Sequence, residues 1–196
     1  MQPRAAMRRA RFLEVAARLI GELGYEAVTM TAIAKEAEAS IGALYDYFPD
    51  KESLAIALTA QVVAESDAHW KRLLANPSSL TKDALAELFV EGALELVRER
   101  PAYLPLFDAP IAYTRSNADR EPLRRAFAVA LQAASPELAD DQAFLRAQVI
   151  VELIKALLRL YKQAPAQTRE LAPDEFKKLI RLYLGDASSQ MPANQA

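Results

Sequence analysis

The sequence predicts an all-α protein. Apolar residues recur at helical spacing along most of the 196 residues, and no stretch shows the strict alternation of a half-buried strand. Prolines, glycines and short polar runs separate the periodic segments. Beyond the short segments near residues 31–54, the expected helices cover residues 11–23, 50–74, 81–98, 119–134, 140–162 and 174–184. Because 52% of the residues are hydrophobic, a sizeable core can form in one large domain or two small ones.

Residues 31–54 carry the most specific local pattern. Ile33 begins an apolar stripe on a short helix that Thr31 is expected to cap, and the pattern breaks after residue 37. Ser40 is placed to cap a second short helix, whose Leu44 and Phe48 lie four residues apart on one face. Two short helices joined by a tight turn are typical of a helix-turn-helix.

The stretch from Ser40 to Leu54 resembles the recognition-helix signature of the TetR family of bacterial transcriptional regulators, A-G-V-S-x-G-x-L-Y-x-Y/H-F-x-x-K-E-x-L. The matching positions are Ala37, Ser40, Gly42, Leu44, Tyr45, Tyr47, Phe48, Lys51, Glu52 and Leu54. The resemblance implies a three-helix helix-turn-helix DNA-binding domain over residues 1–52. It also implies a larger helical domain for ligand binding and dimerisation over residues 53–186. Residues 187–196 are small and polar, and we expect a disordered tail.

The resemblance also implies which residues meet a double-stranded DNA operator. These are Thr31, Ser40, Ile41, Gly42, Ala43, Tyr45, Asp46, Tyr47 and Lys51. Gly42 lacks a side chain, so the backbone can approach DNA closely there. By resemblance, Tyr45 and Tyr47 give hydroxyls to phosphates or ring faces to base methyl groups, and Lys51 contacts a phosphate. A buried, structural Tyr45 is the alternative, since Leu44 and Phe48 already mark the inner face.

Three residues depart from the family signature. Glu38 occupies a turn position that is usually Gly, where a left-handed conformation would cost about 1 kcal/mol and favour a reshaped turn. Ile41 can pack on a thymine methyl group or on the helix-turn-helix scaffold. Asp46 can accept from a cytosine amino group or pair with an arginine. These departures leave a second reading open, in which the chain is a helical ligand-binding or interaction protein with weak or no specific DNA binding.

Composition excludes several kinds of chemistry. The chain has no cysteine, so it cannot use a catalytic thiol. It has one histidine, His69, so a histidine-based metal cluster cannot form within one chain. We therefore expect no metal, no cofactor and no enzymatic activity. No apolar run is long enough for a membrane span, and we expect a cytoplasmic protein. The net charge is −2, but four arginines precede the first acidic residue and predict a basic N-terminal arm.

The C-terminal helices predict a dimer. The segment 140–162 is apolar over so much of its circumference that it must be buried on two sides, one against its own domain and one against a partner. Asp174 is expected to cap the last helix, which has an apolar face of its own. The expected homodimer interface comprises Val149, Leu153, Leu157, Leu179 and Tyr183.

An aromatic-rich segment predicts a ligand pocket. Three prolines interrupt residues 100–114, and regular helices flank this stretch on both sides. The expected lining is Trp70, Phe89, Tyr103, Phe107, Tyr113 and Phe127. Such a site suits an apolar or aromatic small-molecule effector, with Asp108 or Arg115 as a charged partner, although an ordinary filled core also fits. By resemblance, the effector would change the spacing of two recognition helices in a dimer and release the operator.

Overall fold

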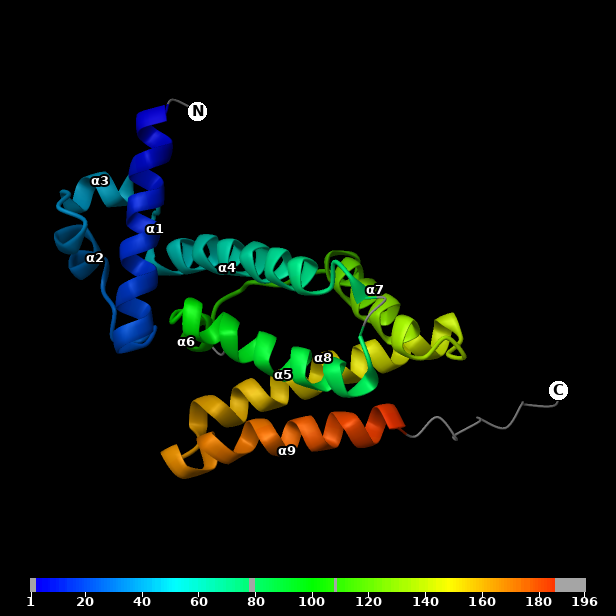
Figure 1. The fold of residues 1–196 in the computed structure, drawn as a ribbon. Coiled ribbons are helices and arrows are strands. Elements are labelled where there is room, and N and C mark those ends of the chain that lie inside the picture. Colours follow the sequence, from blue (N-terminus) through cyan, green and yellow to red (C-terminus); the bar gives the residue numbers. More distant parts are fainter. Residues whose placement is uncertain (1–2, 78–79, 108, 186–196) are drawn as a thin grey trace. The chain divides into compact units, whose positions relative to one another are not determined.

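The computed structural model describes residues 3–77, 80–107 and 109–185, and within these ranges it is helical and contains no strand (Figure 1). The helices are α1 Pro3–Leu23, α2 Met30–Glu36, α3 Ile41–Tyr45, α4 Lys51–Leu73, α5 Lys82–Glu99, α6 Tyr103–Phe107, α7 Asn117–Ala134, α8 Asp140–Gln163 and α9 Ala166–Gly185. The predicted all-α class is confirmed. In the part of the chain that the structure describes, no helix combines the length and apolarity needed to cross a membrane. The tail expected at residues 187–196 lies outside the described residues.

The chain divides into two compact units. The first lies within residues 1–69 and 95–116, and the second within residues 70–94 and 117–196. The division expected at residue 52 therefore falls elsewhere, because the first unit also includes α4 as far as His69 and the whole of α6. The reason is local packing, since α6 lies against α1 and its Leu106 joins the core around α4.

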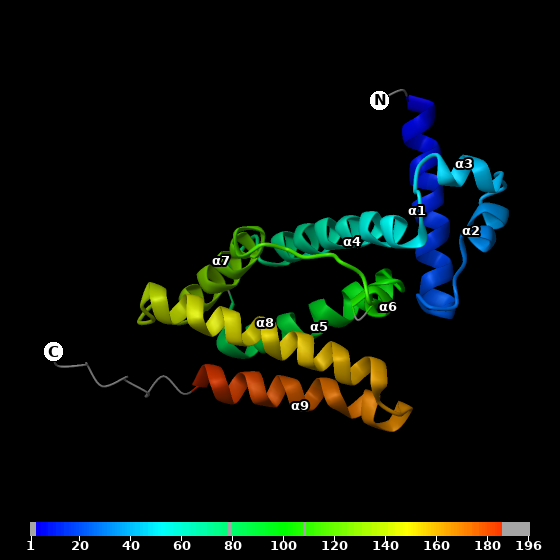
Figure 2. The same cartoon turned by 180° about the vertical axis from the view of Figure 1, so that it is seen from behind.

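The first unit is organised around α1. Its core includes Phe12, Ile20, Ile33, Leu44, Leu54, Leu58 and Leu106. Both cartoon views place α2 and α3 beside α1 (Figures 1 and 2), in line with the packing of α1 on α2 and of α2 on α3. The first helix starts at Pro3 rather than Arg11, so the expected basic arm is a helical extension. Arg9 on this extension lies 5.3 Å above the Phe48 ring, a cation–π contact that supports the added turns.

Close backbone approach joins α1 to the start of the α6 segment. A Cβ atom added to Gly21 would lie 2.7 Å from the Cβ of Pro101, so only glycine fits this contact. The same segment is tied to α4, where Glu52 accepts from the Ala112 N–H at 3.1 Å. Arg115 donates to both carboxylate oxygens of Asp67, at 2.7 and 3.3 Å. The proline-rich stretch is therefore a fixed part of the first unit.

The second unit packs α7 on α8 and α8 on α9. Lys177 of α9 binds Glu87 and Glu91 of α5 at 2.9 and 2.7 Å, and Arg181 adds a second ion pair to Glu87. The expected start of the last helix at Asp174 is wrong, because α9 begins eight residues earlier. The Pro165 carbonyl accepts from the Arg169 N–H at 2.9 Å and so starts this helix. Pro173 is accommodated inside it.

Candidate nucleic-acid interface

Side-chain caps fix the starts of α2 and α3. The Thr29 hydroxyl accepts from the Ala32 N–H at 3.1 Å, so Thr29 caps α2 and the expected cap at Thr31 is wrong. The helix begins earlier because Met30 is buried and takes the first helical position. Thr31 is exposed on the first turn of α2. Ser40 caps α3 as expected, accepting from the Ala43 N–H at 3.2 Å.

The turn between the two helices keeps its geometry despite the missing glycine. Glu38 has a φ of 54°, the left-handed conformation that closes many helix C-termini. The Ala39 N–H bonds the Ala34 carbonyl at 2.9 Å and the Glu38 N–H bonds the Lys35 carbonyl at 3.1 Å, which is the hydrogen-bond pattern of a Schellman cap. The turn is therefore not reshaped, and the strain of about 1 kcal/mol is retained at Glu38.

Helix α3 has a buried side and an exposed side. Leu44 and Phe48 are buried, whereas Ile41 is 39% exposed and Tyr45 is 48% exposed. The alternative of a buried Tyr45 is thus wrong. A Cβ atom added to Gly42 would meet nothing within 4 Å, and Asp46 is exposed. Five predicted residues, Ser40, Ile41, Gly42, Tyr45 and Asp46, therefore share one solvent-facing surface, with Ala43 half-buried behind it.

Two of the expected DNA contacts are also part of the scaffold. Tyr47 is half-buried, with its ring 5.7 Å from the Phe12 ring. The Lys51 ammonium donates to the Glu26 carbonyl at 3.1 Å and lies 4.3 Å from the centre of the Tyr25 ring. Burial, followed by the charge of Glu26, raises the pKa of the Tyr25 hydroxyl, which stays neutral under this cation. Lys51 therefore joins the start of α4 to the loop before α2.

Exposed cations lie on the helices around α3. Arg4 and Arg8 are exposed on the helical extension of α1, four residues apart on one face, and Lys35 is exposed near the end of α2. Arg18 is different, because its guanidinium is hydrogen-bonded first to Glu36 and also to Glu22, which raises the Arg18 pKa above its usual value. The sequence pattern predicts only a basic arm, in which Arg4 and Arg8 have no defined position. The missed signal was their spacing of four residues, which fits a helix that continues back to Pro3.

The expected pocket residues fall in two groups. Trp70, Phe89 and Phe127 form an aromatic cluster in the second unit, with ring centres 4.7 Å apart for the stacked phenylalanines. All three are buried, so this cluster is a filled core. Tyr103 and Phe107 belong to the first unit, where their rings stack at 6.3 Å.

The aromatic residues of the first unit remain partly accessible. Tyr103, Phe107 and Tyr113 are half-buried. Burial raises the pKa of the Tyr103 hydroxyl, which is hydrogen-bonded to Ser66 on α4. Arg115, the expected charged partner of a ligand, is held by Asp67 at 2.7 Å. Asp108, the other expected partner, lies outside the described residues.

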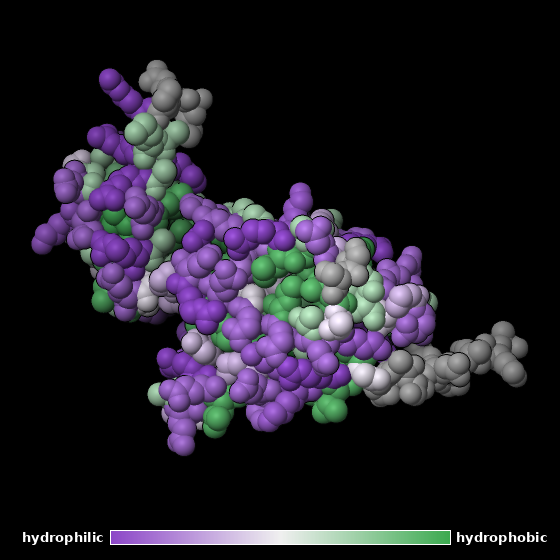
Figure 3. Space-filling model, in the orientation of Figure 1, coloured by the Kyte–Doolittle hydropathy of each residue, from purple (hydrophilic) through white to green (hydrophobic). Residues whose placement is uncertain are grey.

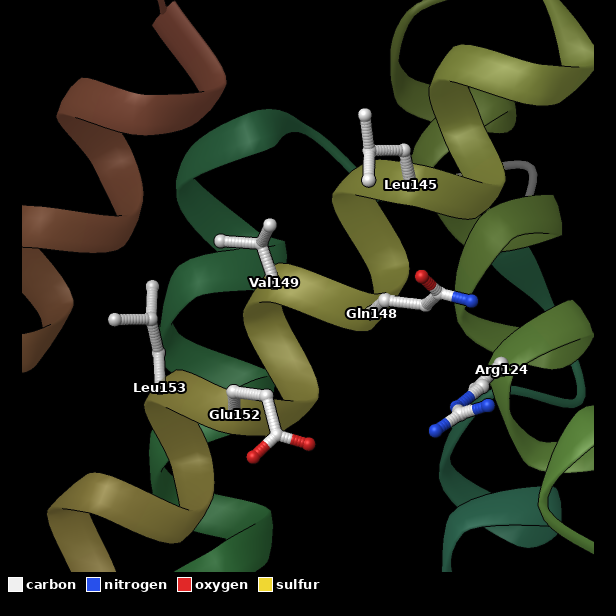
Figure 4. A pocket seen from close by; sticks show the side chains of 6 residues that line it. All are labelled: Arg124, Leu145, Gln148, Val149, Glu152 and Leu153. Atoms are coloured by element: carbon white, nitrogen blue, oxygen red, sulfur yellow. The ribbon is translucent and has the colours of Figure 1, made fainter. Parts of the chain in front are cut away.

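An apolar row runs along the outside of α8. Leu145, Val149 and Leu153 recur every four residues along one side of α8, as Figure 4 shows. They line an open pocket of about 410 Å³. Arg124 of α7 faces the same pocket from the neighbouring helix, and Glu152 lines it from α8 beside Leu153. Leu157, also expected at the dimer interface, is fully buried within its own unit and does not belong to this exposed row. Its position on α8 places it with Ile150 and Ile154 on the inner stripe.

Helix α9 adds a second apolar row. Leu179 is 45% exposed, Leu182 is 73% exposed, and Tyr183 is half-buried beneath the Arg146 guanidinium. Apolar groups protrude along α9 from a largely hydrophilic face in the space-filling view (Figure 3). Sequence reasoning missed Leu145 and Leu182, although their spacing of four and three residues from Val149 and Leu179 was a usable signal.

Comparisons with known proteins agree with this organisation. Residues 12–58 match the family described as bacterial regulatory proteins, tetR family, and residues 83–184 match the tetracyclin repressor-like C-terminal domain. The chain is 26% identical over 187 residues to the HTH-type transcriptional repressor KstR of Rhodococcus jostii, covering 92% of this chain and 84% of that protein. A 65-residue stretch, 33% of this chain and 32% of the relative, is 37% identical to KstR of Mycolicibacterium smegmatis.

Solved structures share the fold. A TetR-family regulator from Pectobacterium atrosepticum superposes with a TM-score of 0.68 at 20% identity, covering 94% of this chain and 95% of the other. A TetR-family regulator from Streptomyces coelicolor superposes with a TM-score of 0.63 at 23% identity, covering 91% and 98%. These likenesses extend the match from the helix-turn-helix to the helices that follow it.

Proposed function

The chain belongs to the TetR family of transcriptional regulators, and from this premise we propose that it is a ligand-responsive repressor that binds a palindromic operator as a dimer. Regulators of this family bind DNA operators and small-molecule effectors, form dimers, and are not enzymes. The observation that carries the proposal is the exposed side of α3, where Ile41, Gly42 and Tyr45 face solvent above a fully packed scaffold.

The geometry of the helix-turn-helix supports DNA binding. The left-handed Glu38 preserves the turn, which removes the main reason to read the chain as an interaction protein without DNA affinity. A recognition helix enters the major groove with the residues of its first turns against the base edges. Ser40, Ile41, Gly42, Tyr45 and Asp46 occupy those positions here.

Phosphate contacts come from the neighbouring elements in this proposal. Exposed Arg4 and Arg8 lie on α1, and Lys35 and Thr31 lie on α2. Lys51 uses one donor on the Glu26 carbonyl, so the other two N–H groups of its ammonium are available to a phosphate oxygen. Tyr47 is half-buried, and in this proposal its hydroxyl contacts the DNA backbone.

The proposed dimer face combines α8 and α9. Val149 and Leu153 on α8 and Leu179 and Tyr183 on α9 are half-buried or exposed although they are apolar or aromatic. Rows of exposed apolar side chains on two adjacent helices are characteristic of a protein interface. Pairing with a second copy about a two-fold axis would cover both rows and the open pocket beside Arg124.

The proposed effector is a small apolar or aromatic molecule. The support is the half-buried stacked rings of Tyr103 and Phe107, together with half-buried Tyr113 in the same unit, since apolar sites with few polar groups suit such ligands. Trp70, Phe89 and Phe127 already fill their space, so a ligand would reach them only by displacing a ring. The effector would favour a dimer whose recognition helices no longer match successive major grooves about 34 Å apart. The effector can shift the equilibrium between the DNA-binding and released states by no more than the difference in its binding free energy for these two states.

The proposal is tested with the full-length protein and a library of random duplexes. Repeated selection should enrich a palindromic sequence, and fluorescence anisotropy should show tighter binding to it than to a shuffled duplex of equal composition. Light scattering should give the mass of a dimer. Binding of equal strength to every duplex would refute a sequence-specific regulator.

The effector site is tested through Phe107 once a releasing compound has been found by screening the protein–operator complex. Phe107→Ala should weaken the compound's potency and spare operator binding in its absence, because Phe107 belongs to α6 and not to the surface of α3. Val129→Ala, an exposed site on α7, is the matched control and should leave potency intact. Full potency in Phe107→Ala would place the effector elsewhere.

A further inference from the structure

The base-reading surface of α3 carries none of the usual side chains for guanine or adenine. From Ser40 to Asp50 the sequence is S-I-G-A-L-Y-D-Y-F-P-D, with no Arg, Lys, His, Asn or Gln. Guanine is read chiefly by Arg or Lys at O6 and N7, and adenine by Asn or Gln at N6 and N7. A helix without these residues must draw its sequence preference from another feature of the base edges.

The exposed side of α3 offers apolar surface in place of those groups. Ile41 is 39% exposed and Tyr45 is 48% exposed, and because they are four residues apart they are neighbours on one face. Gly42 lies next to Ile41, and its open surroundings let the helix backbone come close to the groove floor. The apolar group that B-DNA presents in the major groove is the C5-methyl of thymine.

We propose that Ile41 and Tyr45 read thymine methyl groups, so that the operator half-site is thymine-rich where α3 contacts it. This inference rests on the proposed function and adds the base that the helix selects. Ile41 keeps more than a third of its surface in solvent, whereas Ile33 of the same unit is fully buried, so the Ile41 side chain is accessible to a base edge. Asp46, also exposed, is an acceptor that suits a cytosine amino group beside the thymines.

The polar neighbours of Ile41 do not supply a competing readout. The Ser40 hydroxyl already accepts from the Ala43 N–H at 3.2 Å, which fixes its position as a cap. Ala43 is half-buried, and Leu44 is fully buried. At the start of α3 the apolar contact of Ile41 and Tyr45 is therefore the main source of base discrimination, and Asp46 adds a polar contact at its end.

Deoxyuridine substitution isolates the methyl group. Deoxyuridine pairs as thymidine does and lacks only the C5-methyl, so each thymidine of the selected operator is replaced singly and affinity is measured by anisotropy. One or two positions per half-site should weaken wild-type binding about fourfold each, the effect of uncovering one buried methyl group. The same replacements should change binding by Ile41→Ala or Tyr45→Ala much less at the position that each residue reads.

Two controls separate the possible failures. Leu23→Ala removes an exposed leucine from the end of α1, away from α3 in the sequence, and should keep the full sensitivity to deoxyuridine. Circular dichroism of each variant confirms that the exposed substitutions leave the fold intact. If a sequence is enriched but no deoxyuridine weakens wild-type binding, or Ile41→Ala and Tyr45→Ala keep the wild-type sensitivity, the inference is wrong and the proposed function stands. If no sequence is enriched, the proposed function fails and the inference fails with it.

Discussion

Replacing Gly42 with alanine should make the protein more stable and a weaker DNA binder. The added Cβ meets nothing within 4 Å, and Gly42 has no positive φ to protect. Glycine inside a helix costs about 0.5–1 kcal/mol relative to alanine. Because Gly42 lies in the first turn of a short helix, we expect a gain of about 0.5 kcal/mol, which raises Tm by about 1–2 °C in a chain of this size.

The opposite effect is expected at the DNA surface. If the backbone of Gly42 lies against the groove, an extra methyl group overpacks that contact and costs about 1–3 kcal/mol, or roughly a 5- to 150-fold loss of operator affinity. Thermal unfolding by circular dichroism and operator titration by anisotropy measure the two effects on one preparation. Gly185→Ala is the matched control, because its added Cβ also meets nothing within 4 Å and it lies at the end of α9. Operator affinity equal to wild type in Gly42→Ala would refute the reasoning about close approach.

Three further substitutions test the strain, the ion pairs and the dimer face. Glu38→Gly should raise the free energy of unfolding by up to about 0.5 kcal/mol, because relief of the left-handed strain exceeds the added chain entropy, and a lower Tm would contradict this. Lys177→Met should lower the free energy of unfolding by about 1 kcal/mol at pH 7. Hydrogen bonding to Lys177 lowers the pKa of Glu87, and hydrogen bonding to Glu87 raises the pKa of Lys177. The ion pair therefore stabilises the fold between the usual pKa values of 4.5 for Glu and 10.5 for Lys. This stabilisation is lost as the pH falls below 4.5, where Glu87 becomes protonated, or rises above 10.5, where Lys177 loses its proton. The variant and the wild type should therefore converge in urea titrations at low pH, and a constant difference would exclude the ion pair as the cause. Leu182→Arg should give a monomer by light scattering, whereas Leu23→Arg should stay dimeric, and two dimers would exclude α9 from the interface.

Periodicity alone predicted the buried face of the second short helix. Leu44 and Phe48 are buried, as their spacing of four residues indicated. The choice between two competent caps, Thr29 and Thr31, depended on the burial of Met30, which local sequence does not reveal. The two roles open for Ile41 could likewise be weighed only once its exposed fraction was known.

For the larger helices, the sequence by itself determined the helical class, the approximate extent of most elements and the excess of apolar surface on α8. These properties follow from the 3.6-residue repeat, which each segment carries in its own side chains. Only the tertiary structure decided that Leu157 faces inward while Leu145 faces outward, since two apolar stripes on one helix are equivalent until a neighbour covers one of them. It also decided that α6 and most of α4 share a unit with the helix-turn-helix, through contacts such as Gly21 on Pro101 and Asp67 with Arg115. These pairs are separated by 48 or more positions along the chain, so no local pattern could have brought them together.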